Sequence, residues 1–183
     1  MLTLLIIFLP LVFSAILISF GTKENARKIA LFGAFAELLA VISAFVLFNK
    51  QELNNFVFAT DWISRLGVQF SFAVDGISLL LIGLTGILVP LIIVSSFKHN
   101  YSRSGFFYGL ILFMQSALMG VFTATDGLLF YVFWELALLP VFFIISLYGG
   151  ENRIKITLKF FIYTIFGSLF MLVALVYLYT KTP

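Results

Sequence analysis

The chain has 183 residues, of which 62% are hydrophobic and 18% aromatic, whereas only 10% are charged. Its mean hydropathy of +1.16 excludes a soluble globular domain, which needs a charged and hydrated surface. The formal net charge of +3 does not indicate a nucleic-acid partner, because the Lys and Arg residues lie in short clusters between apolar runs rather than in one basic stripe. We therefore expect an integral membrane protein in contact with the lipid bilayer.

Six segments have the length and polarity of membrane-spanning helices, which need about 20 mostly apolar residues. They are predicted at residues 2–20, 29–48, 77–97, 106–123, 128–148 and 160–179. Two of the six segments contain a charged residue, Glu37 in the second and Glu135 in the fifth. The predicted fold is an all-α membrane protein, with residues 1–183 forming a single polytopic membrane segment.

The basic residues between these segments predict the orientation of the helices. Eight Lys and Arg residues follow the first, third and fifth segments, namely Lys23, Arg27, Lys28, Lys98, Arg103, Arg153, Lys155 and Lys159. Three lie on the other side, namely Lys50, Arg65 and Lys181. Because Lys and Arg in short loops favour the cytoplasmic side, we expect both termini on the non-cytoplasmic side of a bacterial inner membrane.

The connector at residues 49–74 is the one long stretch outside the predicted helices, and it faces outward in this orientation. In GVQFSFAV, apolar and polar side chains alternate with the period of a strand, and NFVFAT supplies an antiparallel partner. We expect a small β-hairpin in this connector, with DWISRLG as its turn and Trp62 at the level of the lipid headgroups. An unstructured connector is the alternative.

The fifth segment combines Glu135 with a proline one turn later. A charged residue at the centre of a membrane helix costs roughly 2.5–3.5 kcal/mol on insertion scales, so its presence there indicates a function. Pro140 lacks an N–H group and therefore leaves the carbonyl of Leu136 without its helical partner. A water molecule could bridge the carboxyl and this carbonyl, which favours a proton-binding site at Glu135. The alternative is that Glu135 only hydrogen-bonds to a neighbouring helix.

Two further residues are supporting candidates for the proton path. Glu37 has no proline beside it, so local packing explains it at least as well as proton transfer. Lys159, at the cytoplasmic beginning of the sixth segment, could turn toward a proton path or extend its amine to the headgroups, and we favour the headgroups.

Residues 62–172 contain two long ordered motifs. One runs through DWISRLGVQFSFAVDGISLLLIGLTGILVPLIIVSS, and the other combines WELALLPVFFIISLYGG with KFFIYTIFGSLFMLVAL. This stretch resembles the antiporter-like membrane subunits of respiratory complex I, the proton-pumping NADH:quinone oxidoreductase. The similarity is greatest to subunits of the M type, whose mitochondrial counterpart is NADH dehydrogenase subunit 4. Residues before about 56 match only in general character.

The resemblance implies a role for Glu135, because the family carries a proton-relay glutamate in a Trp-Glu pair on its fifth helix. Glu135 follows Trp134 and matches that position. The family pairs this glutamate with a lysine on a broken seventh helix, within inverted repeats. Since the sequence stops at Pro183, we expect it to be the N-terminal part of a longer subunit in the membrane arm of the complex, alongside other membrane-arm subunits.

Three functions remain open from the sequence. The first is the proton-translocating subunit of NADH:quinone oxidoreductase. The second is a subunit of a multisubunit cation/proton antiporter or of a membrane-bound hydrogenase, which share the family. The third is a stand-alone six-helix structural or assembly protein.

The chain shows no motif for a redox cofactor. It contains no cysteine, no GxGxxG, no Walker motif and no metal-ligand cluster. The resemblance therefore implies that flavin, iron–sulfur clusters and quinone are bound by partner subunits, while this chain contributes proton translocation.

Overall fold

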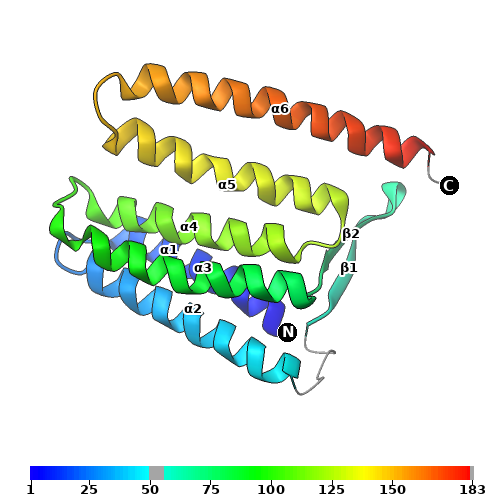
Figure 1. Cartoon of the computed structure of the whole chain (residues 1–183), viewed down its shortest axis with the longest axis horizontal. Coiled ribbons are helices and arrows are strands. Elements are labelled where there is room, and N and C mark those ends of the chain that lie inside the picture. Colours follow the sequence, from blue (N-terminus) through cyan, green and yellow to red (C-terminus); the bar gives the residue numbers. More distant parts are fainter. Residues whose placement is uncertain (50–55, 182–183) are drawn as a thin grey trace.

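The computed structural model describes residues 1–49 and 56–181, and within them six long helices and one two-stranded sheet are present (Figure 1). The helices are α1 (Leu2–Phe20), α2 (Ala26–Asn49), α3 (Gly76–Ser95), α4 (Ser104–Thr123), α5 (Gly127–Tyr148) and α6 (Arg153–Lys181). Each is long and apolar enough to cross a membrane. The predicted all-α membrane fold is confirmed.

The predicted boundaries agree closely for α1 and differ most for α6. This last helix begins at Arg153 rather than at residue 160, so that Arg153, Lys155 and Lys159 lie on the helix instead of in a connection. The prediction counted apolar residues that fit the hydrocarbon core. A helix can continue beyond that core, because charged side chains stay hydrated in the headgroup region.

Helices α1 to α4 form a bundle, and α5 packs on α4 while α6 packs on α5 (Figure 1). Small residues bring α1 and α4 close together, as is common between membrane helices. The hydroxyl of Ser14 donates to the carbonyl of Gly109 at 2.7 Å, and that of Ser116 donates to the carbonyl of Ile7 at 2.7 Å. These bonds fix the depth at which α1 lies against α4.

The two ends of the bundle differ. At one end, which we call the hairpin end, lie the sheet, the beginning of α1 and the end of α6 (Figure 1). At the other, the loop end, the chain turns from α1 to α2, from α3 to α4 and from α5 to α6. Helices α2, α4 and α6 therefore run from the loop end toward the hairpin end, and α1, α3 and α5 run the opposite way.

The sheet is the predicted β-hairpin, which the structure confirms. Strands β1 (Phe58–Ile63) and β2 (Val68–Phe72) are antiparallel, and Phe58 lies opposite Phe72. The strand β1 includes Asp61 and Trp62, which were predicted in the turn, because Asp61 pairs with Gln69. A turn over 64–66 follows, closed by a glycine with φ of 62°. Residues 50–55 of the predicted connector lie outside the described residues.

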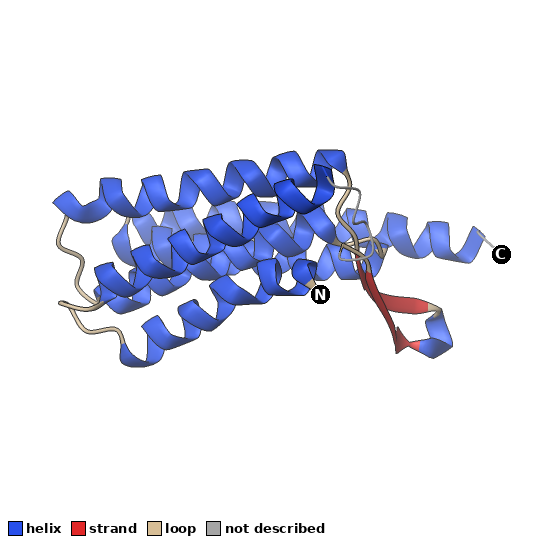
Figure 2. Ribbon diagram, turned by 90° about the horizontal axis from the view of Figure 1, so that it is seen from below, coloured by secondary structure: helices blue, strands red, loops and turns tan. Residues whose placement is uncertain are grey.

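The hairpin projects from the bundle (Figure 2) but is tied to the turn between α4 and α5. The carbonyl of Ser71 accepts from the N–H of Thr125 at 3.1 Å, and their hydroxyls are 2.7 Å apart. One carboxylate oxygen of Asp126 accepts from the N–H of Gln69 at 3.1 Å. The other accepts from the N–H of Leu128 at 2.9 Å and caps α5. The hairpin therefore fixes the beginning of the helix that carries Glu135.

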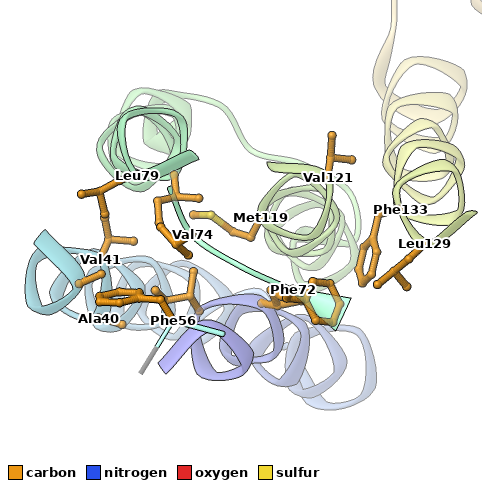
Figure 3. Packing of buried hydrophobic residues seen from close by; sticks show 14 residues of the cluster. Ala40, Val41, Phe56, Phe72, Val74, Leu79, Met119, Val121, Leu129 and Phe133 are labelled. Atoms are coloured by element: carbon orange, nitrogen blue, oxygen red, sulfur yellow. The ribbon is translucent and has the colours of Figure 1, made fainter. Parts of the chain in front are cut away.

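Buried apolar residues near the hairpin end form a cluster to which both the helices and the hairpin contribute (Figure 3). Phe72 of β2 is completely buried, and its ring lies 5.6 Å from that of Phe133 on α5 in an edge-on arrangement. Phe56, just before β1, is also buried and accepts a hydrogen bond at its carbonyl from Thr3 at 2.9 Å. The connector is thus part of the core at this end.

Candidate functional site

Glu135 lies near the middle of α5 and opens onto a groove between α5 and α6. It follows Gly127, the first residue of α5, by eight positions, which corresponds to about 12 Å of helical rise. The groove has a volume of ≈ 350 Å³. It is lined by Tyr131, Val132, Glu135, Leu136, Leu139, Phe161 and Ile165. We call this the α5–α6 groove.

The carboxyl of Glu135 is only partly enclosed. The residue is half-buried, but its Oε1 atom is buried and has no hydrogen-bond partner among the described residues. Buried polar atoms in folded proteins are normally satisfied by protein groups or by bound water. A carboxyl in this position can therefore bind water or hold a proton.

The proline of α5 places a second acceptor at the same site. Pro140 is buried inside the helix and has no N–H to donate to the carbonyl of Leu136. Leu136 lines the α5–α6 groove next to Glu135. Glu135 and Leu136, two of the elements predicted from the sequence, thus both line the groove.

Tyr131 is a residue of this groove that the sequence analysis did not identify. It precedes Glu135 by four positions, so both side chains occupy the same face of α5. Its hydroxyl can donate and accept hydrogen bonds. The four-residue spacing was the signal that could have identified it. Tyr131 extends the polar groups of the groove by one helical turn toward the hairpin end.

The wall that α6 contributes is apolar. Phe161 and Ile165 face α5, and the ring of Phe161 lies 4.8 Å from that of Phe142. Lys159 is exposed and does not line the groove. It precedes Phe161 by two positions, which is about half a turn around the helix. In this structure Lys159 is therefore not brought together with Glu135.

Glu37 lies in a different part of the molecule. It is 0% exposed within the α1–α4 bundle, and neither carboxyl oxygen has a hydrogen-bond partner among the described residues. It does not line the α5–α6 groove. The two charged residues of the predicted membrane helices therefore belong to separate sites.

A larger concavity, of ≈ 590 Å³, lies at the turn between α5 and α6. It is lined by basic and apolar residues including Arg153, Lys155 and Leu158, and it contains no carboxyl group. Because it lies at the helix ends, it is a less suitable place for moving protons through the membrane. Within the described residues, no group of three or more His, Asp and Glu side chains could hold a metal ion.

Two family models match the chain in succession. Residues 1–122 match the model described as NADH-ubiquinone oxidoreductase chain 4, amino terminus. Residues 124–183 match the model described as NADH:quinone oxidoreductase/Mrp antiporter, TM. Glu37 falls in the first match and Glu135 in the second.

Individual relatives are similar over almost the whole chain. The chain is 41% identical over 172 residues to F(420)H(2) dehydrogenase subunit M of Methanosarcina mazei, covering 93% of this chain and 35% of that protein. It is 36% identical over 181 residues to NADH-quinone oxidoreductase subunit M of Rickettsia prowazekii, covering 96% of this chain and 37% of that protein. It also resembles a chain in the structure of respiratory complex I from Thermus thermophilus with bound NADH. That match has a TM-score of 0.80 and 33% identity, and covers 95% of this chain and 35% of the other. The chain thus spans about a third of the length of these relatives.

Proposed function

This chain belongs to the family of NADH-ubiquinone oxidoreductase chain 4, the antiporter-like membrane subunits, and we propose that it relays protons across the membrane through Glu135. The observation that carries this proposal is a carboxyl at mid-helix that opens onto a groove and has a buried oxygen with no partner among the described residues. Its position in a membrane-spanning helix gives the carboxyl the depth that a proton carrier needs.

The proton is taken up and released as the electrostatic surroundings of Glu135 change. A cation that approaches within ~4–6 Å stabilises the carboxylate and promotes release of the proton, and withdrawal of the cation promotes uptake. We expect this cation to be the lysine of a seventh helix that the family resemblance implies. A small movement of that helix would then control the charge on Glu135.

The groove supplies a short path on either side of the carboxyl. Toward the hairpin end, the hydroxyl of Tyr131 can exchange protons with water bound at Glu135. Toward the loop end, the carbonyl of Leu136 can accept a hydrogen bond from the same water. The apolar wall formed by Phe161 and Ile165 limits the number of water molecules, so protons pass through few sites.

Redox chemistry belongs to partner subunits in this proposal. The relatives named above are subunits of dehydrogenases and quinone oxidoreductases, which are enzyme complexes. This chain contributes no thiolate ligand, since it has no cysteine. We therefore expect flavin, iron–sulfur clusters and quinone in other subunits, and contacts of this chain with the neighbouring subunits of a membrane arm.

The proposed orientation places the loop end in the cytoplasm. The loop end carries most of the basic residues, including Arg27, whose guanidinium donates to the carbonyl of His99 at 2.8 Å. The hairpin and both termini then lie on the other side. A Ser102→Cys variant of this cysteine-free chain should resist an impermeant thiol reagent added from outside, whereas Val57→Cys should react. The reverse pattern would overturn the orientation.

A multisubunit cation/proton antiporter is the second candidate, because the model matched by residues 124–183 is described for both kinds of complex. The two candidates differ in their partners. Purification of the tagged chain with dehydrogenase subunits and quinone reductase activity would support the first. Purification without redox subunits, with cation-dependent proton movement, would support the second. The stand-alone structural protein is not favoured by the family to which the chain belongs.

The proposed function is tested by Glu135→Gln in the assembled membrane complex. Removing a positioned proton donor typically slows a reaction by about 10²–10⁴-fold, so we expect at least a ten-fold loss of proton translocation. Glu24→Gln, which alters an exposed glutamate in the α1–α2 turn, is the control and should retain translocation. Undiminished translocation in an assembled Glu135→Gln complex would refute the proposal.

A further inference from the structure

The α1–α4 bundle has two separate apolar clusters, and on α2 the residue between them is Glu37. The cluster near the loop end includes Ala34 of α2, and the one near the hairpin end includes Ala40. The side chains of Ala34, Glu37 and Ala40 all point into the bundle, because these residues are three positions apart on α2 and are buried. The apolar core of the bundle is thus interrupted at the level of Glu37.

The same interruption occurs on α4. The loop-end cluster extends to Leu112, and the hairpin-end cluster resumes at Met119. Between them lie Gln115, which is 0% exposed, and Ser116, which is 4% exposed. Ser116 is satisfied by its hydrogen bond to α1, but neither side-chain atom of Gln115 has a partner among the described residues.

Glu37 and Gln115 occupy corresponding positions along two parallel helices. Helices α2 and α4 run in the same direction and pack against each other. Glu37 follows Ala26, the first residue of α2, by 11 positions, and Gln115 follows Ser104, the first residue of α4, by 11 positions. This corresponds to about 16 Å of rise in both helices. Within the described part of the chain, no direct hydrogen bond joins the two side chains.

Two prolines add backbone acceptors to the interior of the bundle. Pro10 of α1 and Pro90 of α3 are both buried, and they release the carbonyls of Ile6 and Gly86 respectively. Gly86 faces α2, since a Cβ atom at this glycine would lie 3.3 Å from Val41, one turn from Glu37. Carbonyls point toward the C-terminus of a helix, so that of Gly86 points along α3 toward the level of Glu37.

Glu37 has no counter-charge among the described residues of the bundle interior. Helices α1 and α3 contain no titratable side chain, and that of α4 is Tyr108, which lies two turns toward the loop end and accepts from Ser96 at 3.0 Å. The basic residues of α2, Arg27 and Lys28, lie in its first turn. An ionised carboxylate buried without a counter-charge is strongly unfavourable, so this surrounding favours a carboxyl that holds a proton.

We propose that Glu37 and Gln115 form a proton-binding site with bound water in the middle of the α1–α4 bundle, separate from the α5–α6 groove. Water molecules can supply the hydrogen bonds that the carboxyl, the amide and the released carbonyls do not find in the described residues. The ligand is a proton held by Glu37 and shared with this water. The site does not depend on Glu135 and holds whether or not that residue relays protons.

Infrared difference spectroscopy of the membrane-reconstituted complex tests the site. The spectrum of the parent minus that of Glu37→Gln should contain one carbonyl-stretch band of a protonated carboxyl group. This band should shift to lower frequency in D₂O, because exchange requires water at the site. Gln115→Leu, which keeps Glu37, should displace the band. Glu24→Gln should leave it unchanged.

Three results would overturn the proposal. A missing band would mean that Glu37 is ionised, and a band that does not shift in D₂O would mean that the carboxyl is dry. A band that Gln115→Leu does not displace would mean that the amide is not part of the site. If Glu37→Gln does not assemble, the spectrum of the parent can be compared with that of Gln115→Leu, and each can be recorded in H₂O and D₂O. Both complexes retain Glu37, so these spectra still test whether a protonated carboxyl contacts water and Gln115.

Discussion

Helices α1 to α4 are more buried than helices α5 and α6, although all six are apolar enough to cross a membrane. The buried share of the most apolar stretch is 33% for α1, 28% for α2, 44% for α3 and 72% for α4, compared with 17% for α5 and 6% for α6. Small residues account for the difference, because lipid is as apolar as a leucine side chain and does not drive helices together. Gly105 of α4 lies against Gly21, whereas a Cβ atom at Gly167 of α6 would contact nothing.

The same comparison separates the two carboxyls that lie within the long helices. Glu37 is completely buried in the bundle, whereas Glu135 opens onto a groove formed by α5 and α6. A group that exchanges protons with both sides of a membrane needs access and a surrounding that can change. The α5–α6 groove offers the access, which supports the proposal that Glu135 relays protons.

The strongest effect on stability is expected at the junction of the bundle with α5. Phe72→Ala should lower the free energy of unfolding by about 3–5 kcal/mol, because this ring is completely buried against Phe133. Phe170→Ala on α6 is the matched control, since Phe170 is 63% exposed, and it should change stability little. Unfolding of the chain in mixed micelles by a denaturing detergent measures both. Equal effects would contradict the division into two regions.

The next effect concerns the close approach of α1 and α4. In Gly105→Ala the new Cβ atom would contact the backbone of Gly21 and come within 2.7 Å of the carbonyl oxygen of Leu17, so the helices must separate. We expect a loss of about 1–3 kcal/mol in the same unfolding measurement. Gly167→Ala should be neutral or slightly stabilising, because alanine favours the helix. A tolerated Gly105→Ala would show that the two helices do not need this contact.

A smaller effect is expected where the two regions are connected. Asp126→Ala should lower stability by about 0.5–2 kcal/mol, because it removes the cap of α5 and the bond to β2. Hydrogen exchange should increase at the amides of Gln69 and Leu128 together. Asp126→Asn keeps an oxygen that can cap the helix and should have less effect. Faster exchange at only one of the two amides would argue against Asp126 as the link.

The smallest effect is a dependence on pH at the beginning of α3. The pKa of Asp75 is held below its ordinary value of 3.8, because the carboxylate accepts a hydrogen bond from the N–H of Ser78. This stabilisation is complete above the ordinary value and is lost as the pH falls through the lower value of the folded protein. The melting temperatures of the parent and Asp75→Asn should therefore converge at acidic pH. A constant difference would exclude this explanation.

Much of the fold followed from residue patterns. Apolar length identified the six helices, and the alternation around Phe70 identified the hairpin. The extent of β1 did not follow, because it depends on pairing across the hairpin and on the ring of Trp62, which lies 6.2 Å from that of Phe70. The beginning of α6 at Arg153 did not follow either, since helical hydrogen bonding continues past the apolar segment.

The candidate sites were predicted only in part. Glu135 was identified because a charge is rare in such a segment, and Pro140 because it releases the carbonyl next to this glutamate. Tyr131 was missed, because its four-residue spacing from Glu135 indicates only a shared helix face, and the groove on that face is formed by packing against α6. The role proposed for Gln115 depends on which helix packs against α2, and local sequence carries no information about that pairing.

We propose that proton transfer requires a carboxyl group inside the α5–α6 groove, and that this group need not be at position 135. The direct test restores a carboxyl to the Glu135→Gln complex at two other positions of α5. Leu139 lines the groove one turn from Glu135, whereas Ala137 does not line it. We predict that Leu139→Glu recovers part of the proton translocation and that Ala137→Glu recovers none. Equal recovery at both positions, or no recovery with Leu139→Glu in an assembled complex, would contradict the account.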